Sequence, residues 1–182
     1  QGTEMTYEDM EDDTRLILAA GEELAQYLSS PIILWRVKHC NQPLSPGNLL
    51  LAITRLKTVN EIAVQHDEMN KVEKLIDTRR QAWENRARQE IPLRLNQYRE
   101  LVDEYLEQGA IDASYRSNIS TRVKLDLLFR SLAAEPYVEQ RKAQELDRQL
   151  GALLPEGDFI WEPELETGFP KSIYAYLYVR KK

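Results

Sequence analysis

Apolar residues recur at helical spacing from Met69 to Tyr105, and this stretch constrains the fold more than any other. They lie three, four or seven residues apart, in one stripe along a helix of roughly ten turns, with Arg, Lys, Glu and Gln on the other faces. Such a helix must bury its stripe against partner helices, because isolated helices are marginally stable in water. The stripe consists of Met69, Val72, Ile76, Trp83, Ala87, Ile91, Leu95, Tyr98, Val102 and Tyr105.

Pro92 interrupts this pattern once. A proline in a helix interior removes a backbone hydrogen bond and clashes with the preceding turn, at a cost of about 3 kcal/mol. The apolar stripe nevertheless continues in phase from Trp83 to Tyr98. We therefore expect a kink near Pro92 rather than a reversal of direction, followed by a C-terminal cap at Gly109.

Capping signals predict shorter helices in the first part of the chain. Residues 12–14, Asp-Asp-Thr, are N-cap candidates for a first helix that ends near Ser29. Residues 31–40 are ambiguous, because their β-branched side chains suit a strand while Pro31 suits the first position of a short helix. The neighbouring segments on both sides are helical, so we expect a helix there.

The next helix begins at Ser45 and Pro46, a side-chain cap followed by a residue whose missing N–H costs nothing at that position. We expect its apolar side to run from Leu49 to Ala63. The helix then either breaks near His66 or continues directly into the long helix.

Further helices follow the long one, and the chain ends in aromatic segments. Asp112 or Ser114 caps a helix that ends near Pro136, and Pro136 itself starts another helix. Residues 159–161 and 173–179 are aromatic-rich and are separated by a loop with proline and glycine. They predict a short two-stranded element or an extended C-terminal strap.

These elements predict a mainly α fold, an antiparallel helical bundle with one long kinked helix and a small C-terminal β element. We expect an acidic, flexible segment over residues 1–12, in which residues 1–2 are treated as an expression remnant. The bundle then covers residues 13–155. Residues 156–182 form the aromatic β hairpin or strap that packs on the bundle, because an isolated hairpin is marginally stable.

Composition limits the classes of function. The chain has 182 residues, a net charge of −6 and one cysteine. No apolar run approaches the length of a membrane span, and the acidic start of the sequence does not resemble a signal peptide. The lone Cys40 cannot form an internal disulfide, which fits a reducing compartment. We therefore expect a cytoplasmic protein that does not interact with membranes.

Motifs for metal, cofactor or nucleophilic chemistry are absent from the sequence. His39 and His66 have no Glu three residues before them, as a di-iron bundle requires, and neither His-Glu-x-x-His nor Cys-x-x-Cys occurs. Glycine-rich phosphate loops and Gly-x-Ser-x-Gly are also missing. We expect no metal, no cofactor and no catalytic residue. An enzyme is not favoured, although an active site formed between subunits stays open.

Basic residues gather on the long helix and provide a candidate anion-binding face. Arginine-rich helices contact phosphates, but acidic residues interleave with these arginines at spacings that suit intrahelical ion pairs. An ion-paired surface is therefore favoured over nucleic-acid binding. The candidate residues are Arg79, Arg80, Arg86, Arg88 and Arg94.

Large aromatic side chains form the other candidate site, either an interface or a pocket. Aromatic residues are enriched at protein interfaces, and they also line pockets for flat apolar ligands. The candidate residues are Trp35, Trp83, Tyr98, Tyr105, Trp161, Tyr174, Tyr176 and Tyr178.

The function expected first is a non-enzymatic helical protein that acts through protein–protein contacts or as a scaffold, as a homodimer. An over-long amphipathic helix with an aromatic strap favours it. The alternative is a small-molecule-binding or regulatory bundle with an aromatic-lined pocket. A second alternative is a nucleic-acid accessory protein that uses the arginine face.

Overall fold

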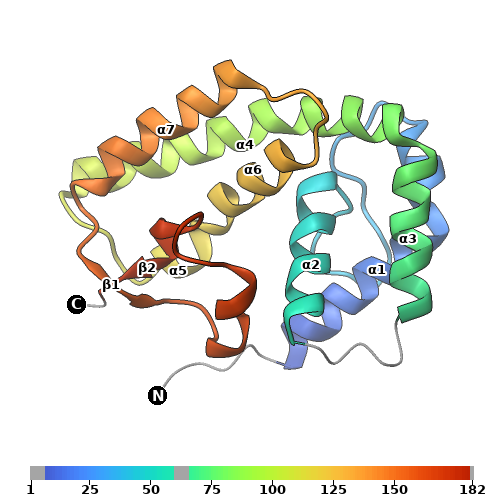
Figure 1. The fold of residues 1–182 in the computed structure, drawn as a ribbon, viewed down its shortest axis with the longest axis horizontal. Coiled ribbons are helices and arrows are strands. Elements are labelled where there is room, and N and C mark those ends of the chain that lie inside the picture. Colours follow the sequence, from blue (N-terminus) through green and yellow to red (C-terminus); the bar gives the residue numbers. More distant parts are fainter. Residues whose placement is uncertain (1–6, 60–65, 181–182) are drawn as a thin grey trace.

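A computed structural model describes residues 7–59 and 66–180 (Figure 1). Within them the chain is mainly helical, with seven α-helices and a small two-stranded antiparallel sheet, which confirms the mainly α prediction at this level. The elements are α1 (Tyr7–Leu28), α2 (Pro46–Val59), α3 (His66–Thr78), α4 (Arg80–Gln108), α5 (Tyr115–Asn118), α6 (Ser120–Arg130), α7 (Tyr137–Gly151), β1 (Glu156–Phe159) and β2 (Tyr178–Val179).

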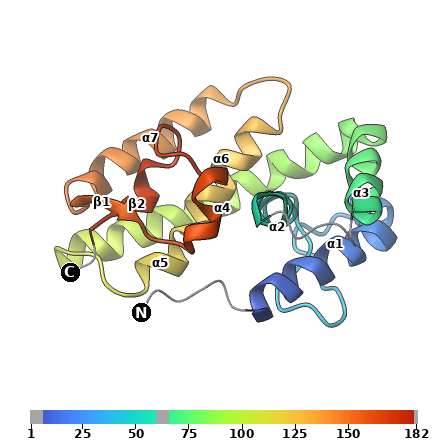
Figure 2. The same ribbon diagram turned by 60° about the horizontal axis from the view of Figure 1, so that its bottom comes forward.

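The hydrophobic core consists of two clusters, which define two lobes. The N-terminal lobe comprises α1, α2, α3 and the start of α4, with buried residues from Leu16 to Trp83. The C-terminal lobe comprises the rest of α4, α5 to α7 and the C-terminal segment, with buried residues from Ala87 to Val179. Leu51 of α2 packs into this second cluster, so α2 contacts both lobes. Figures 1 and 2 show α4 crossing from one lobe to the other.

The long stripe does not form one helix, and the prediction of continuity through it is wrong. The chain leaves helical geometry at Arg79, with φ −113° and ψ 36°, and α4 leaves α3 in a new direction (Figure 1). This change lets Ile76 pack on the N-terminal core while Ala87 packs on the C-terminal core. Pro92 lies inside α4 on its exposed side, where water reaches the backbone.

The first helix starts at Tyr7, so the predicted cap at residues 12–14 is wrong. Asp12 and Asp13 are buried inside α1. Asp12 Oδ1 accepts the backbone N–H of Asn41 at 2.6 Å, and Asp13 binds the Arg55 guanidinium at 2.7 and 2.8 Å. Because both partners are distant in sequence, local capping rules wrongly identify these carboxylates as helix caps.

Residues 31–40 contain neither the expected helix nor a regular strand. Their one ladder contact is an isolated bridge, in which the backbone N–H groups of Trp35 and Leu44 each donate to the other residue's carbonyl, at 2.9 and 2.7 Å. Three carbonyls near the end of α1 accept hydrogen bonds from Arg86 of α4, namely those of Tyr27, Ser30 and Ile32. A buried side chain from another helix therefore satisfies backbone groups that a local helix would have satisfied.

Other local signals are confirmed. Ser45 Oγ accepts the Asn48 N–H at 3.1 Å and caps α2, and Gly109 adopts the left-handed conformation at the end of α4 with φ 72°. Pro136 directly precedes α7. The expected extension of the second helix to residues 62 and 63 lies outside the described residues.

The two remaining expectations are correct only in part. The helix expected between Asp112 and Pro136 is divided at Ile119 into α5 and α6 and ends at Arg130. In the C-terminal segment, a 3₁₀ helix at Ala175–Leu177 replaces much of the expected strand over residues 173–179, and another at Pro163–Gly168 lies in the expected loop. Only β2 pairs with β1, because aromatic side chains turn this segment into the core.

Candidate functional site

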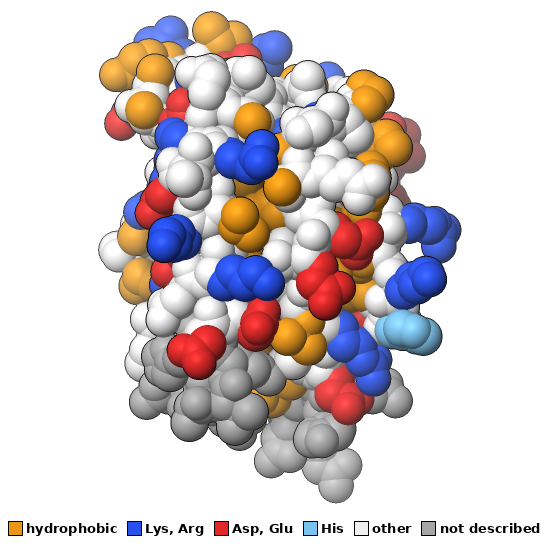
Figure 3. Space-filling view, turned by 90° about the vertical axis from the view of Figure 1, so that its right-hand side faces the viewer, with side chains coloured by type: hydrophobic (Ala, Val, Ile, Leu, Met, Phe, Trp, Pro, Cys, Tyr) orange, Lys and Arg blue, Asp and Glu red, His pale blue; other side chains and the backbone are white. Residues whose placement is uncertain are grey.

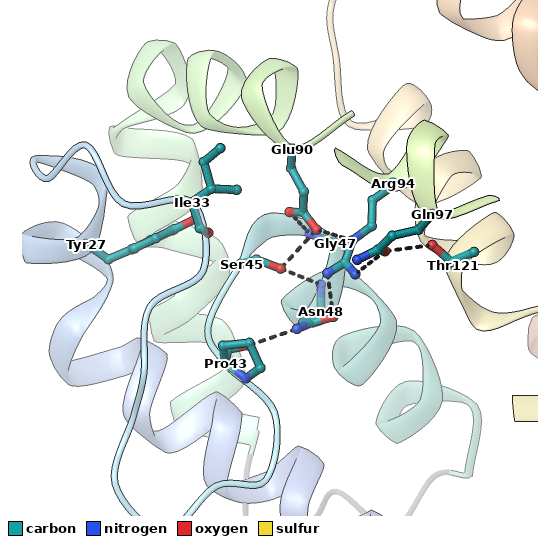
Figure 4. Close-up of polar contacts among 10 residues, drawn as sticks. All are labelled: Tyr27, Ile33, Pro43, Ser45, Gly47, Asn48, Glu90, Arg94, Gln97 and Thr121. Carbon is teal, nitrogen blue, oxygen red and sulfur yellow. Dashed lines mark hydrogen bonds and ion pairs between the residues drawn. The ribbon is translucent and has the colours of Figure 1, made fainter. Parts of the chain in front are cut away.

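A buried polar network joins the lobes at the start of α2 (Figure 4). The fully buried Glu90 carboxylate accepts the Gly47 N–H at 2.8 Å and the Ser45 hydroxyl at 3.0 Å. Arg94 donates to the same carboxylate at 2.8 Å and to Asn48 Oδ1 at 3.1 Å. The positive end of α2 and a guanidinium thus compensate the charge of Glu90, and the network links residues of the two lobes.

A second polar network lies in the C-terminal lobe around Arg122 of α6. Arg122 binds Asp147 of α7 through Nε and Nη2, at 2.8 and 2.9 Å. Its Nη1 lies 3.0 Å from Asp126 Oδ1. Tyr98 donates to Asp147 at 2.7 Å, and Tyr176 donates to Asp126 at 2.5 Å. Burial raises the pKa values of Tyr98 and Tyr176, so both hydroxyls stay protonated at neutral pH.

This second network borders a cavity of about 420 Å³, which we call the tyrosine cavity. Tyr98, Tyr176 and Tyr178 contribute to its walls, together with aliphatic residues of α7 and the C-terminal segment. The exposed Lys171–Glu156 ion pair lies at its rim. The cavity therefore combines aromatic walls with a partly buried ion pair, Arg122–Asp147.

A larger cavity of about 670 Å³, the apolar cavity, lies beside it. Its walls come from the α4–α5 loop (residues 109–113) and the segment that follows α7 (residues 152–155), together with Tyr115, Ile160 and Val179. Leu154 and Val179 line both cavities and form the wall between them. Apart from Asp112, Arg116 and Arg180, its lining side chains carry no charge.

The structure divides the predicted aromatic residues between the two lobes. Trp35 and Trp83 belong to the N-terminal lobe, and the Trp35 ring contacts Tyr27 edge-on at 6.1 Å between centroids. The others are buried in the C-terminal lobe. Three of these line the tyrosine cavity, while Tyr105, Trp161 and Tyr174 pack in the core.

The predicted arginine face is also divided. Arg86 and Arg94 are buried and bonded inside the chain, whereas Arg79, Arg80 and Arg88 are exposed. Arg80 pairs with Asp77 at 2.6 Å. Acidic and basic side chains are interspersed on the face that includes α3 and α1 (Figure 3), so this face presents no patch of one sign.

Sequence reasoning missed the charged residues of the tyrosine cavity and the lining of the apolar cavity. Asp147 and Arg122 belong to polar helix positions that look like solvated surface, and no local motif distinguishes them. Leu153, Leu154 and the 109–113 loop had one available signal, since apolar residues at a helix end and in a loop point to a contact beyond the helix.

Within residues 7–59 and 66–180, no three His, Cys, Asp or Glu side chains are grouped as metal ligands would be. The same residues include no helix with the length and apolar character that spanning a membrane requires. Comparison of the chain with models of protein families, with curated proteins and with solved structures found no match.

Proposed function

We propose that this protein binds a small, mainly apolar molecule in the apolar cavity of its C-terminal lobe. The observation that carries this proposal is a cavity of about 670 Å³ with mostly aliphatic walls. Ligand pockets typically have volumes of roughly 300–1,000 Å³, with apolar linings and a few polar groups. A ligand there gains about 25 cal/mol for each Å² of apolar surface removed from water.

Polar groups at the edge of the cavity orient the ligand. Asp112, Arg116 and Arg180 lie on its lining, and Arg116 is tied to Glu162 at 2.9 Å. We propose that the apolar body of the ligand lies against Leu153, Ile160 and Val179, with a polar group directed toward these charged residues. We further propose that α4, α6 and α7 form an antiparallel bundle that holds the cavity open, and that α4 bends at Pro92.

A fluorescence titration with N-phenyl-1-naphthylamine, an uncharged apolar probe, tests this function. We expect saturable binding of one probe per chain. Leu153→Trp fills the cavity and should abolish this binding, whereas the matched control Leu18→Trp, at an exposed position of α1, should leave it unchanged. Equal binding to both variants would show that the probe does not occupy this cavity.

A second candidate function, contact with another protein, is favoured by one observation. Tyr137 and Val138 at the start of α7 are 69% and 62% exposed, which is high for large apolar side chains. Light scattering over a concentration series tests the homodimer. A homodimer that uses this surface dissociates when Val138 is replaced by Asp. A single species of 21.2 kDa at high concentration contradicts the homodimer.

A further inference from the structure

The carboxylate of Asp147, which lines the tyrosine cavity, keeps one acceptor position. Its Oδ1 accepts hydrogen bonds from Arg122 and Tyr98, whereas its Oδ2 accepts one, from Arg122 Nη2. Each carboxylate oxygen has two lone pairs, so Oδ2 has room for another donor. The side chain is 31% exposed and lines the cavity. A ligand in the cavity can therefore reach it.

The charges around the tyrosine cavity favour a cation. The charged residues that line the cavity balance one another, since Arg122 pairs with Asp147 and Lys171 pairs with Glu156 at the rim. Asp126, which does not line the cavity, also pairs with Arg122. The group around Arg122 therefore has one carboxylate in excess, which attracts a cation.

The tyrosine rings favour the same kind of ligand. The face of an aromatic ring carries partial negative charge and attracts cations within about 6 Å. Arg122 already uses this attraction, since its guanidinium carbon lies 5.1 Å from the Tyr176 centroid and 5.9 Å from that of Tyr98. The hydroxyls of Tyr98, Tyr176 and Tyr178 all donate within the chain, so none of the three is left to donate to an anion.

We propose that the tyrosine cavity is a binding site for a primary organic ammonium with an apolar body. The ammonium donates a hydrogen bond to Asp147 Oδ2 and lies near the tyrosine rings. The apolar body packs on Leu150, Ile173 and Val179. This site is separate from the apolar cavity and does not depend on the function proposed for it.

Calorimetric titration of the full chain with phenethylamine at neutral pH tests the proposal. The amine is protonated there, like a lysine side chain. We expect saturable binding of one molecule, on the order of tenfold tighter than that of 3-phenylpropionate, which replaces the cation with an anion on the same body. Absence of saturable heat with phenethylamine, or equal affinity for both compounds, overturns the proposal.

A pair of tryptophan variants assigns the binding to this cavity. Ile173 is 37% exposed and lines only the tyrosine cavity, so Ile173→Trp blocks it with little risk to the fold. Leu34→Trp is the matched control at an exposed position in the N-terminal lobe. We expect Ile173→Trp to abolish phenethylamine binding and Leu34→Trp to preserve it. Unchanged binding in Ile173→Trp would overturn the assignment, whatever the result with the apolar probe.

Discussion

Two ion pairs with a buried arginine, Glu90–Arg94 and Asp147–Arg122, differ in their surroundings. Glu90 and Arg94 are almost fully enclosed, and the carboxylate also receives the N–H at the start of α2 and a serine hydroxyl. Arg122 is equally buried, but its partner Asp147 borders a cavity and keeps an unused lone pair. A buried charge with every partner in place serves the fold, whereas one beside a cavity is available to a ligand.

The lobes differ in their cavities. Around the N-terminal core, residues 34–43 form a cavity of about 240 Å³, and a cavity of about 550 Å³ between α2 and residues 167–168 is lined largely by threonine and lysine. The C-terminal lobe has the apolar and tyrosine cavities side by side. This difference supports our proposal that a ligand binds in the C-terminal lobe.

Removing the negative charge from each pair should have the largest effect on stability, and it tests the contrast between the two pairs. Glu90→Gln leaves Arg94 buried beside a neutral amide, and we expect a loss of about 3–5 kcal/mol in the free energy of unfolding. Asp147→Asn should cost less, because water reaches that side chain. Urea denaturation measures both, with the exposed Glu100→Gln as a control near zero. Equal losses at residues 90 and 147 would contradict the contrast.

Crowding the Glu90 network without changing its charges should have the next largest effect. A Cβ atom at Gly47 would lie 2.5 Å from Glu90 Oε2, which is held by its other hydrogen bonds. We expect Gly47→Ala to destabilise the protein by about 1–3 kcal/mol. Gly151→Ala is the matched control, since nothing lies within 4 Å of its added Cβ. If both variants melt at the same temperature as the parent, the network can rearrange around the added methyl group without loss of stability, which would contradict the prediction.

The smallest expected effect concerns Lys124 and the dependence of the free energy of unfolding on pH. Burial lowers its pKa to about 7, as do Arg94 and Arg55, while Glu90 and Asp13 oppose the shift. In the unfolded chain its pKa is about 10.4, so above about pH 7 the unfolded state binds a proton that the folded state lacks. Stability should therefore rise with pH above 7, by at most about 1.4 kcal/mol per unit.

Replacing the lysine isolates this contribution. The free energies of unfolding of the parent and of Lys124→Met, measured between about pH 7 and 8.5, should converge as the pH rises. Lys142→Met, at an exposed position of α7, should give a curve parallel to that of the parent. A parallel curve for Lys124→Met as well would mean that Lys124 is charged in the folded state.

Local signals in the sequence predicted some helix ends correctly. Ser45 caps α2 and Gly109 ends α4 because both act on neighbouring backbone groups. The break at Arg79 and the irregular loop at residues 31–40 were not predictable in this way. The break depends on which of the two cores each half of the apolar stripe packs against. The loop depends on the hydrogen bonds that Arg86 donates to carbonyls near the end of α1.

The candidate site was predictable only in its aromatic part. Tyr98, Tyr176 and Tyr178 were singled out as aromatic residues, and the structure brings them to one cavity. Asp147 and Arg122 carry no local signal, since each occupies an ordinary polar position of a helix. Their pairing requires that α6 and α7 both pack on α4, which spacing within either helix does not reveal.

The central claim, that the C-terminal lobe binds an apolar ligand, is tested most directly by methyl NMR of the isoleucine-labelled full chain during titration with N-phenyl-1-naphthylamine. Isoleucines report on both lobes at once. The account predicts saturable shifts at Ile111 and Ile160, which line the apolar cavity, and none at Ile17 and Ile53 of the N-terminal core. Shifts confined to the N-terminal lobe, or no saturable shift at Ile111 and Ile160, would contradict it.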